Sequence, residues 1–275
     1  MWRLLLALPL LAAPAGAAGE AARRVVSMNP SLTETLLALG AADRLVGVDE
    51  DSARRLAPAR GLPTVGGLFN PSLEAILALE PDLVVMVPSA QQRGLGERLG
   101  ELGVPVLELP NITLEELLAS VEALGARVGR PGAAAARIRA IRSAWAEISH
   151  QTAARPPLRT VAVLQREPLY VVGPGSWIDS MLAAAGARNL GAELGEPFPQ
   201  AAEEWLIAAA PDLLLDATED PGREPLEYWS RWPSLPAVAS GRVVRLDEEW
   251  IRPGPYLDRA LRALAAAIEA AAGPP

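Results

Sequence analysis

Short aliphatic runs alternate with segments of helical periodicity along most of the chain. The runs have the length and the β-branched content of strands, and they occupy residues 24–26, 46–48, 82–87, 160–164 and 212–215. Parallel neighbours in a sheet need a crossover connection, which is usually a helix, so this alternation favours parallel pairing. We therefore predict an α/β fold with parallel-type sheets.

The pattern contains an internal repeat. Glu74 lies seven residues before a Pro-Asp-Leu triplet, and Glu204 lies seven residues before a second one. In both passages a helical segment closes at the proline and a strand follows it. A second pair of similar segments, 36–41 and 181–187, supports the repeat. We interpret each copy as one structural unit and predict two similar lobes.

One long helical segment separates the two copies. Residues 133–153 contain neither proline nor glycine, and a helix of this length spans ~30 Å. Ile138, Ile141, Trp145 and Ile148 recur at helical spacing, which predicts a buried face packed against a lobe. We expect an N-terminal lobe at 18–131, a connecting helix at 132–155 and a C-terminal lobe at 156–275.

The first residues have the features of a secretory signal. Arg3 provides a positive start, residues 4–13 form an apolar run, and residues 15–17 are small, as a cleavage site requires. A membrane anchor is the competing interpretation, but the run is shorter than the ~20 residues that a spanning helix needs. We predict a signal peptide at 1–17 and a periplasmic mature protein.

Composition narrows the possible chemistry. The chain has no cysteine, which excludes disulfides, thiolate metal sites and a lipidated cysteine, and its single histidine, His150, leaves little room for zinc or triad chemistry. Ser176 lacks the following glycine of a nucleophile elbow. The net charge is −8, so we do not expect a nucleic-acid partner. We predict no catalytic residue, no metal site, no resident cofactor and no enzymatic activity.

The two glutamates of the repeat can be interpreted in two ways. Glu74 and Glu204 both stand at the start of a predicted helix, where the helix dipole favours a carboxylate, so they can be solvated first-turn residues. Alternatively, they form one negative contact per lobe and dock on basic sites of a two-fold symmetric partner.

Four longer segments have a distinctive sequence: 27–40 (SMNPSLTETLLALG), 66–85 (GGLFNPSLEAILALEPDLVV), 199–213 (PQAAEEWLIAAAPDL) and 233–255 (PSLPAVASGRVVRLDEEWIRPGP). Together they resemble a known family, the periplasmic binding proteins of ABC importers for vitamin B12, ferric siderophores and haem. The resemblance implies two lobes joined by one long helix, a ligand cleft between them, and a binding protein, expected as a monomer, that works with an ABC permease dimer and its ATPase. It also implies that Glu74 and Glu204 meet arginines of that dimer, although the adjacent Glu203 could replace Glu204.

The resemblance also implies a ligand class, and it is strongest to the cobalamin-binding member. Tyr170, Phe198 and Trp250 fall where that member carries aromatic residues against the corrin, although packing in the core or hinge is the alternative role for each. We expect the cleft at the carboxyl ends of the strands. The predicted ligand contacts are Met28, Asn29, Leu68, Phe69, Tyr170, Phe198, Trp250 and Arg252.

Two other ligands and a different class of function stay open. Haem binders of the family usually carry a tyrosine where this chain has Gly67, and ferric siderophores favour cleft arginines, a role open to Arg166 and Arg252. In each case the metal chelate is cargo and not a cofactor. An exported sensor domain or a cofactor-handling enzyme is the remaining alternative.

Overall fold

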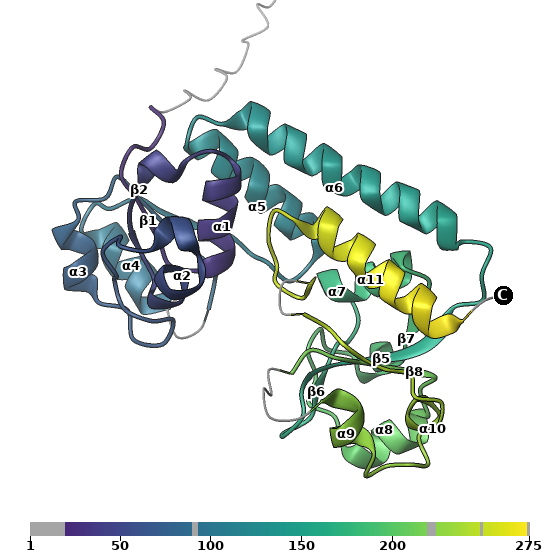
Figure 1. Ribbon diagram of the computed structural model, residues 1–275. Helices are drawn as coiled ribbons and strands as arrows, with labels where there is room; N and C mark the ends of the chain where they lie inside the picture. The colour runs from purple at the N-terminus through teal and green to yellow at the C-terminus, as the bar shows by residue number, and fades with distance from the viewer. Residues whose placement is uncertain (1–19, 90–92, 219–223, 248–249, 274–275) are drawn as a thin grey trace, which may run out of the picture.

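A computed structural model describes residues 20–89, 93–218, 224–247 and 250–273. The predicted signal peptide, residues 1–17, lies outside the described residues. The chain forms two α/β lobes, and a long helix runs along both of them (Figure 1). The predicted fold class is confirmed.

The N-terminal lobe is built on a four-stranded sheet. Its strands pair in the order β2-β1-β3-β4, and every pair is parallel, with Val25, for example, opposite Leu83. The strands are β1 (Val25–Ser27), β2 (Leu45–Val48), β3 (Leu83–Met86) and β4 (Val106–Glu108).

Helices cover both faces of this sheet, because successive strand residues point to opposite faces. Val25 packs in the core under α1, whereas Val26 packs in the core under α3 and α4. The helical segments of this lobe are α1 (Pro30–Ala38), η1 (Ala42–Arg44), α2 (Glu50–Arg55), η2 (Ala57–Ala59), α3 (Leu73–Ala78) and α4 (Arg93–Glu101).

One long helix, α6 (Pro131–Thr152), leads from the N-terminal lobe to the C-terminal lobe, and a second helix, α5 (Leu114–Arg127), packs along it. Helix α5 begins at a capping box formed by Thr113 and Glu116. Leu118 of α5 belongs to the core of the C-terminal lobe, whereas Leu124 belongs to the core of the N-terminal lobe. Ile138 of α6 touches both cores. The two helices therefore bind the lobes together along their length.

The C-terminal sheet is mixed. Strand β5 is its longest; β8 pairs with β5 in parallel, β9 extends β8, and β6 is antiparallel to the last part of β5. Strand β7 pairs with the first part of β5. The strands are β5 (Leu158–Gln165), β6 (Tyr170–Val171), β7 (Ala187–Asn189), β8 (Leu213–Asp216) and β9 (Val243–Arg245).

This sheet also lies between two helical layers. Ala162 and Leu215 face α6, α7 and α11, whereas Val161 and Leu214 face α8, α9 and α10. The helical segments are α7 (Trp177–Ala184), η3 (Leu190–Leu194), α8 (Glu203–Ala209), α9 (Pro225–Trp229), α10 (Pro236–Ala239) and α11 (Leu257–Ala272). Within the described residues, no helix is both long enough and apolar enough to cross a membrane.

Candidate functional site

An apolar pocket of about 370 Å³ lies where the loop between β4 and α5, which we call the crossover loop, meets the C-terminal lobe. Two of its residues come from the crossover loop, four from the C-terminal lobe and two from the loop before α11. None of the described residues that line it is charged, and two carry a polar side-chain group, the amide of Asn111 and the indole N–H of Trp177. The lining consists of Asn111, Ile112, Leu164, Trp177, Ile178, Phe198, Ile251 and Pro253.

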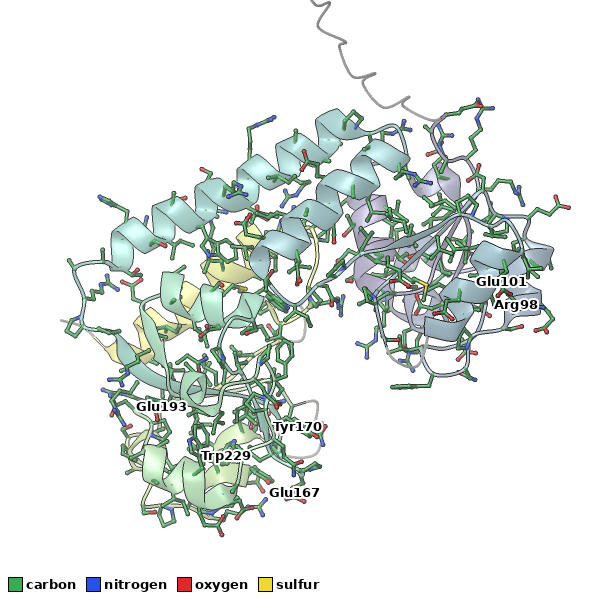
Figure 2. The ribbon with its side chains drawn as sticks, turned by 180° about the vertical axis from the view of Figure 1, so that it is seen from behind. Arg98, Glu101, Glu167, Tyr170, Glu193 and Trp229 are labelled. Atoms are coloured by element: carbon green, nitrogen blue, oxygen red, sulfur yellow. The ribbon has the colours of Figure 1, made fainter. Side chains whose placement is uncertain are left out.

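Phe198 reaches this pocket from a short ribbon beside β6. The Val171 amide donates to the Pro199 carbonyl at 3.1 Å, and Tyr170 bridges to Gln200 in antiparallel register. In that register Tyr170 and Phe198 share one face of the ribbon. Tyr170 lies at the edge of the C-terminal lobe that is turned toward the N-terminal lobe (Figure 2). The ribbon therefore brings together two of the three predicted aromatic contacts.

Trp250 and Arg252 lie in a different hollow. The loop before α11 alternates, with Ile251 and Pro253 in the apolar pocket and Trp250, Arg252 and Gly254 in a neighbouring hollow of about 350 Å³ that Glu34 of α1 also lines. That hollow is more polar, because Arg259 and Tyr256 of the α11 region complete it. Trp250 and Arg252 therefore line a different hollow from Phe198, although Trp250 packs against the same C-terminal core as Phe198.

The predicted contacts of the N-terminal lobe divide into buried and exposed residues. Met28 is 1% exposed and packs in the core under α3, since strand alternation turns it inward, so we leave it out of the proposed contacts. Leu68 is 37% and Phe69 80% exposed on the loop before α3. Exposure of this extent leaves both side chains accessible to a ligand or a partner.

Asn29 has a structural role that the sequence pattern did not reveal. Its Oδ1 accepts from the Ser31 amide at 2.9 Å and from the Ser31 hydroxyl at 2.7 Å, so Asn29 caps α1. Helix α1 begins at Pro30 because proline suits the first helical position and Asn29 precedes it as the cap.

A buried polar network joins α1 and α2 in the N-terminal lobe. The Thr33 hydroxyl donates to Ser27 Oγ at 2.8 Å and lies 2.9 Å from Ser52 Oγ, and Ser52 donates to the carboxylate of Asp49, which caps α2. Asp49 is 2% exposed. Its burial raises its pKa above the ordinary value, and the hydrogen bonds from Ser52 only partly offset this effect.

The C-terminal lobe buries an acid in a different environment. Asp216, at the end of β8, accepts from Arg166 Nε at 2.9 Å and from Trp229 Nε1 at 2.6 Å. The Arg166 guanidinium also lies 4.3 Å from the centre of the Tyr228 ring. Arg166 is therefore a core residue, and this arrangement does not present it to an anionic ligand.

The two repeated glutamates occupy equivalent places on the outer layers of the lobes. Glu74 is the second residue of α3, Glu204 is the second residue of α8, and both are exposed. Helices α3 and α8 lie far apart, one at the outer end of each lobe (Figure 1). Glu203 is exposed beside Glu204.

The chain matches the periplasmic binding protein family over residues 25–250. It belongs to this family. The protein is 29% identical over 260 residues to the vitamin B12-binding protein of Vibrio parahaemolyticus, with 93% of this chain and 92% of the relative covered. The resemblance found in the sequence is thus confirmed.

Solved structures of this periplasmic binding protein family include more than one ligand class. The periplasmic vitamin B12-binding protein BtuF of Vibrio cholerae has a TM-score of 0.79 at 25% identity, covering 92% of this chain and 99% of its own. The periplasmic haem-binding protein RhuT of Roseiflexus sp. RS-1 has a TM-score of 0.78 at 26% identity, covering 91% and 99%. Overall similarity therefore does not distinguish the two ligands, and the pocket chemistry of this periplasmic binding protein must do so.

Most of the lining of the apolar pocket was missed from the sequence. Ile112 and Asn111 lie on the crossover loop, and Trp177 and Ile178 open α7 after a Gly-Pro-Gly-Ser turn. That turn follows β6, which runs antiparallel to β5, so it does not lie at the carboxyl end of a parallel strand, where sites of α/β proteins gather. The lining residue that this rule could have indicated is Leu164, near the end of β5.

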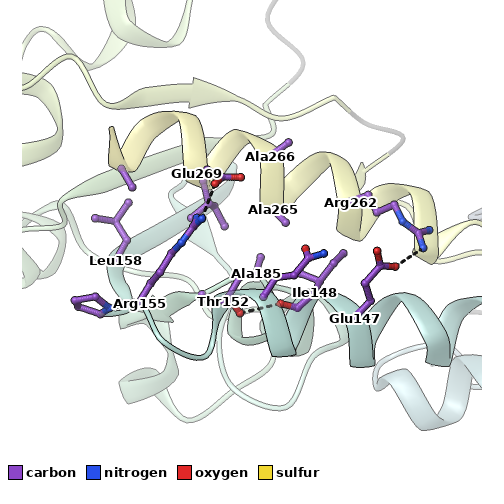
Figure 3. A pocket seen from close by; sticks show the side chains of 15 residues that line it. Glu147, Ile148, Thr152, Arg155, Leu158, Ala185, Arg262, Ala265, Ala266 and Glu269 are labelled. Atoms are coloured by element: carbon purple, nitrogen blue, oxygen red, sulfur yellow. Dashed lines mark hydrogen bonds and ion pairs between the residues drawn. The ribbon is translucent and has the colours of Figure 1, made fainter. Parts of the chain in front are cut away.

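A larger hollow of about 580 Å³ lies away from this site, between α6 and α11. Two ion pairs span it, Glu147 with Arg262 at 3.1 Å and Arg155 with Glu269 at 2.6 Å (Figure 3). These pairs hold the end of the connecting helix against α11. His150 is exposed on the same helix and is not among the residues that line the hollow.

Proposed function

We propose that this protein captures cobalamin or a related corrinoid between its lobes and delivers it to an ABC permease dimer and its ATPase. The observation that supports the ligand class is the uncharged lining of the pocket around Phe198. A corrin is a broad, largely apolar ring with neutral amides at its edge, and aromatic and aliphatic side chains suit such a surface. The Asn111 amide suits those edge amides.

The competing ligands need different partners. Haem carries two carboxylates and ferric siderophores are commonly anionic, so both favour cationic side chains near the bound ring or chelate. Arg166 is engaged with Asp216, and Arg252 lies in the neighbouring hollow. We propose Asn29, Leu68, Phe69, Tyr170, Phe198 and Trp250 as contacts around the rim, with Asn111, Trp177 and Ile251 added at the pocket. Arg252 is left out of the proposed contacts because it lies in the neighbouring hollow.

Delivery depends on the exposed carboxylates. Glu74 and Glu204 project from equivalent helices, and a permease dimer with two-fold symmetry offers two equivalent basic sites to such a pair. Export by the signal peptide at 1–17 would place the mature protein, as a monomer, in the periplasm beside the permease. No chemical change of the ligand belongs to this proposal.

Titration of the purified mature protein tests the ligand. Cyanocobalamin, haemin and a ferric hydroxamate are added separately, and binding is followed by tryptophan quenching and calorimetry. We expect one-to-one binding of cyanocobalamin, and a loss of about tenfold or more in affinity for Phe198→Ala, since one buried aromatic contact is worth a few kcal/mol. Ile207→Ala, an exposed residue on α8, is the matched control.

The structural likeness to a haem-binding protein makes haem the second candidate. Selective haemin binding that Phe198→Ala leaves unchanged would overturn the corrinoid proposal and retain a transport function. Binding of none of the three compounds would overturn both candidates.

A further inference from the structure

We call α3 and α8, which carry Glu74 and Glu204, the docking helices. Both are attached to their sheets by the same backbone geometry. Glu80 and Ala210, at the same position of the repeat, have positive φ values of 44° and 42°, although neither is glycine. In each copy the chain then turns through proline and aspartate into a buried strand. The amide of Asp82 donates to the carbonyl of Arg24 at 2.9 Å, and that of Asp212 to the carbonyl of Arg159 at 2.8 Å.

In both lobes an arginine side chain adds hydrogen bonds to the end of the docking helix. Arg24 donates from Nε to the Glu80 carbonyl at 3.0 Å and from Nη2 to the Leu79 carbonyl at 2.6 Å. Arg159 donates from Nη2 to the Ala209 carbonyl at 2.6 Å. Leu79 and Ala209 are equivalent in the repeat, so two arginines that are far apart in sequence bond the same carbonyl at the end of the two docking helices.

Carbonyls at the end of a helix lack partners within the helix, and a guanidinium satisfies them while complementing the negative end of the dipole. Both helices are short, with six residues in α3 and seven in α8, so a bond at the last turn restrains the whole axis. The glutamate stands at the opposite end of the same axis. The direction in which the glutamate side chain projects therefore depends on how firmly the last turn of the helix is held.

We propose that Arg24 and Arg159 are positioning residues for docking: each holds a short helix at its carboxyl end and thereby orients the glutamate that meets the permease. The proposal rests on the proposed docking of Glu74 and Glu204. Neither arginine touches the partner in this scheme. Both act through the helix.

The restraint is unequal in the two lobes. Ser72 caps α3, its Oγ accepting from the Ala75 amide at 3.1 Å and donating to Glu74 Oε2 at 3.3 Å. Ala202 precedes α8 and provides no side-chain bond to the helix. Glu74 is thus oriented from both ends of its helix, whereas α8 is held at one end and carries two adjacent carboxylates.

The test is a double-mutant cycle on binding to the importer complex of the same organism, reconstituted in nanodiscs. We expect Glu74→Ala to weaken binding about tenfold and Arg24→Gln about threefold, in the range of exposed charge interactions. Because Arg24 acts through Glu74, the double variant should bind no more weakly than Glu74→Ala alone. Arg24→Gln with Glu204→Ala should lose both contributions. Arg24→Lys, which retains the charge, should recover part of the loss.

Matched controls exist in both lobes. Arg23→Gln removes an exposed neighbour that pairs with Glu20, and Arg188→Gln removes the residue opposite Arg159 on β7. Both should bind the importer normally. Arg159→Gln should be coupled to Glu204 and not to Glu74, and ligand affinity should stay unchanged in every variant.

Two results would separate the possible failures. If Arg24→Gln causes the same loss with and without Glu74, the arginine only supports the fold and the positioning proposal is wrong. If Glu74→Ala with Glu204→Ala leaves importer binding unchanged, docking by these carboxylates is wrong, and the positioning proposal is wrong with it.

Discussion

The two lobes share a backbone plan but differ in how they bury charge. Asp49 follows β2 and is surrounded by hydroxyl groups, with Ser52 and Thr33 between it and Ser27. Asp216 ends β8 and is paired with Arg166 and Trp229. The repeat therefore fixes helices, strands and turns, while the polar groups inside each lobe are free to differ. One lobe surrounds its buried acid with hydroxyl groups, and the other pairs its buried acid with a guanidinium.

Replacing the buried aspartate of each lobe with asparagine should give the largest difference in unfolding free energy between the lobes. Asp216→Asn removes the negative partner of a buried guanidinium, and breaking such a pair costs about 3 kcal/mol of unfolding free energy. Asp49→Asn keeps an oxygen to accept from the Ser52 amide, so its cost should stay below about 1 kcal/mol. Urea unfolding followed by tryptophan fluorescence measures both. Equal losses would show that the two acids have the same role.

The repeat could be predicted from sequence because its signal is local. The Pro-Asp-Leu triplets and their glutamates stand close together in each copy, so spacing alone located α3, β3, α8 and β8. The apolar pocket could not be predicted in this way. It joins Ile112, Phe198 and Ile251, three loop positions that come together only through tertiary contacts.

Two of the shortest elements show the same limit. Strands β6 and β7 have two and three residues, and both exist because the long β5 offers a partner along its whole edge. Periodicity over two or three residues carries no usable signal. The antiparallel pairing of Tyr170 was therefore not predicted.

Exchanging the helix caps should reduce the difference between the docking helices. Ser72→Ala removes the bond to the Ala75 amide and should destabilise α3 by about 1 kcal/mol. Ala202 has the extended backbone of a capping residue, with φ −86° and ψ 152°, so Ala202→Ser should stabilise α8 by about 0.5 kcal/mol.

Hydrogen exchange of the first-turn amides of α3 and α8 reports both changes. Ser230→Ala, whose hydroxyl bonds a carbonyl of its own helix, is a control outside the docking helices. If Ala202→Ser leaves exchange in α8 unchanged, the missing cap is not what distinguishes the two helices.

The smallest expected effect is a pH dependence of stability in the acidic range, caused by the buried Asp49 of the N-terminal lobe. Burial raises the pKa of Asp49 in the folded state, so the folded carboxyl binds its proton more tightly than the unfolded one, whose pKa is about 3.9. The unfolded state then carries fewer protons between the two pKa values, and stability falls as the pH rises from the unfolded pKa through the folded pKa. Above the folded pKa the penalty is constant.

Asp49→Asn has no such titration, so the difference in unfolding free energy between the variant and the native protein should grow in favour of the variant across that interval and then level off. Urea unfolding at closely spaced pH values measures this difference, in which the titrations of all other acids cancel. A difference that stays flat across the acidic range would show that the hydroxyls of Ser52 and Thr33 stabilise the ionised carboxylate fully, and the contrast with the ion-paired Asp216 would then be one of partners and not of charge.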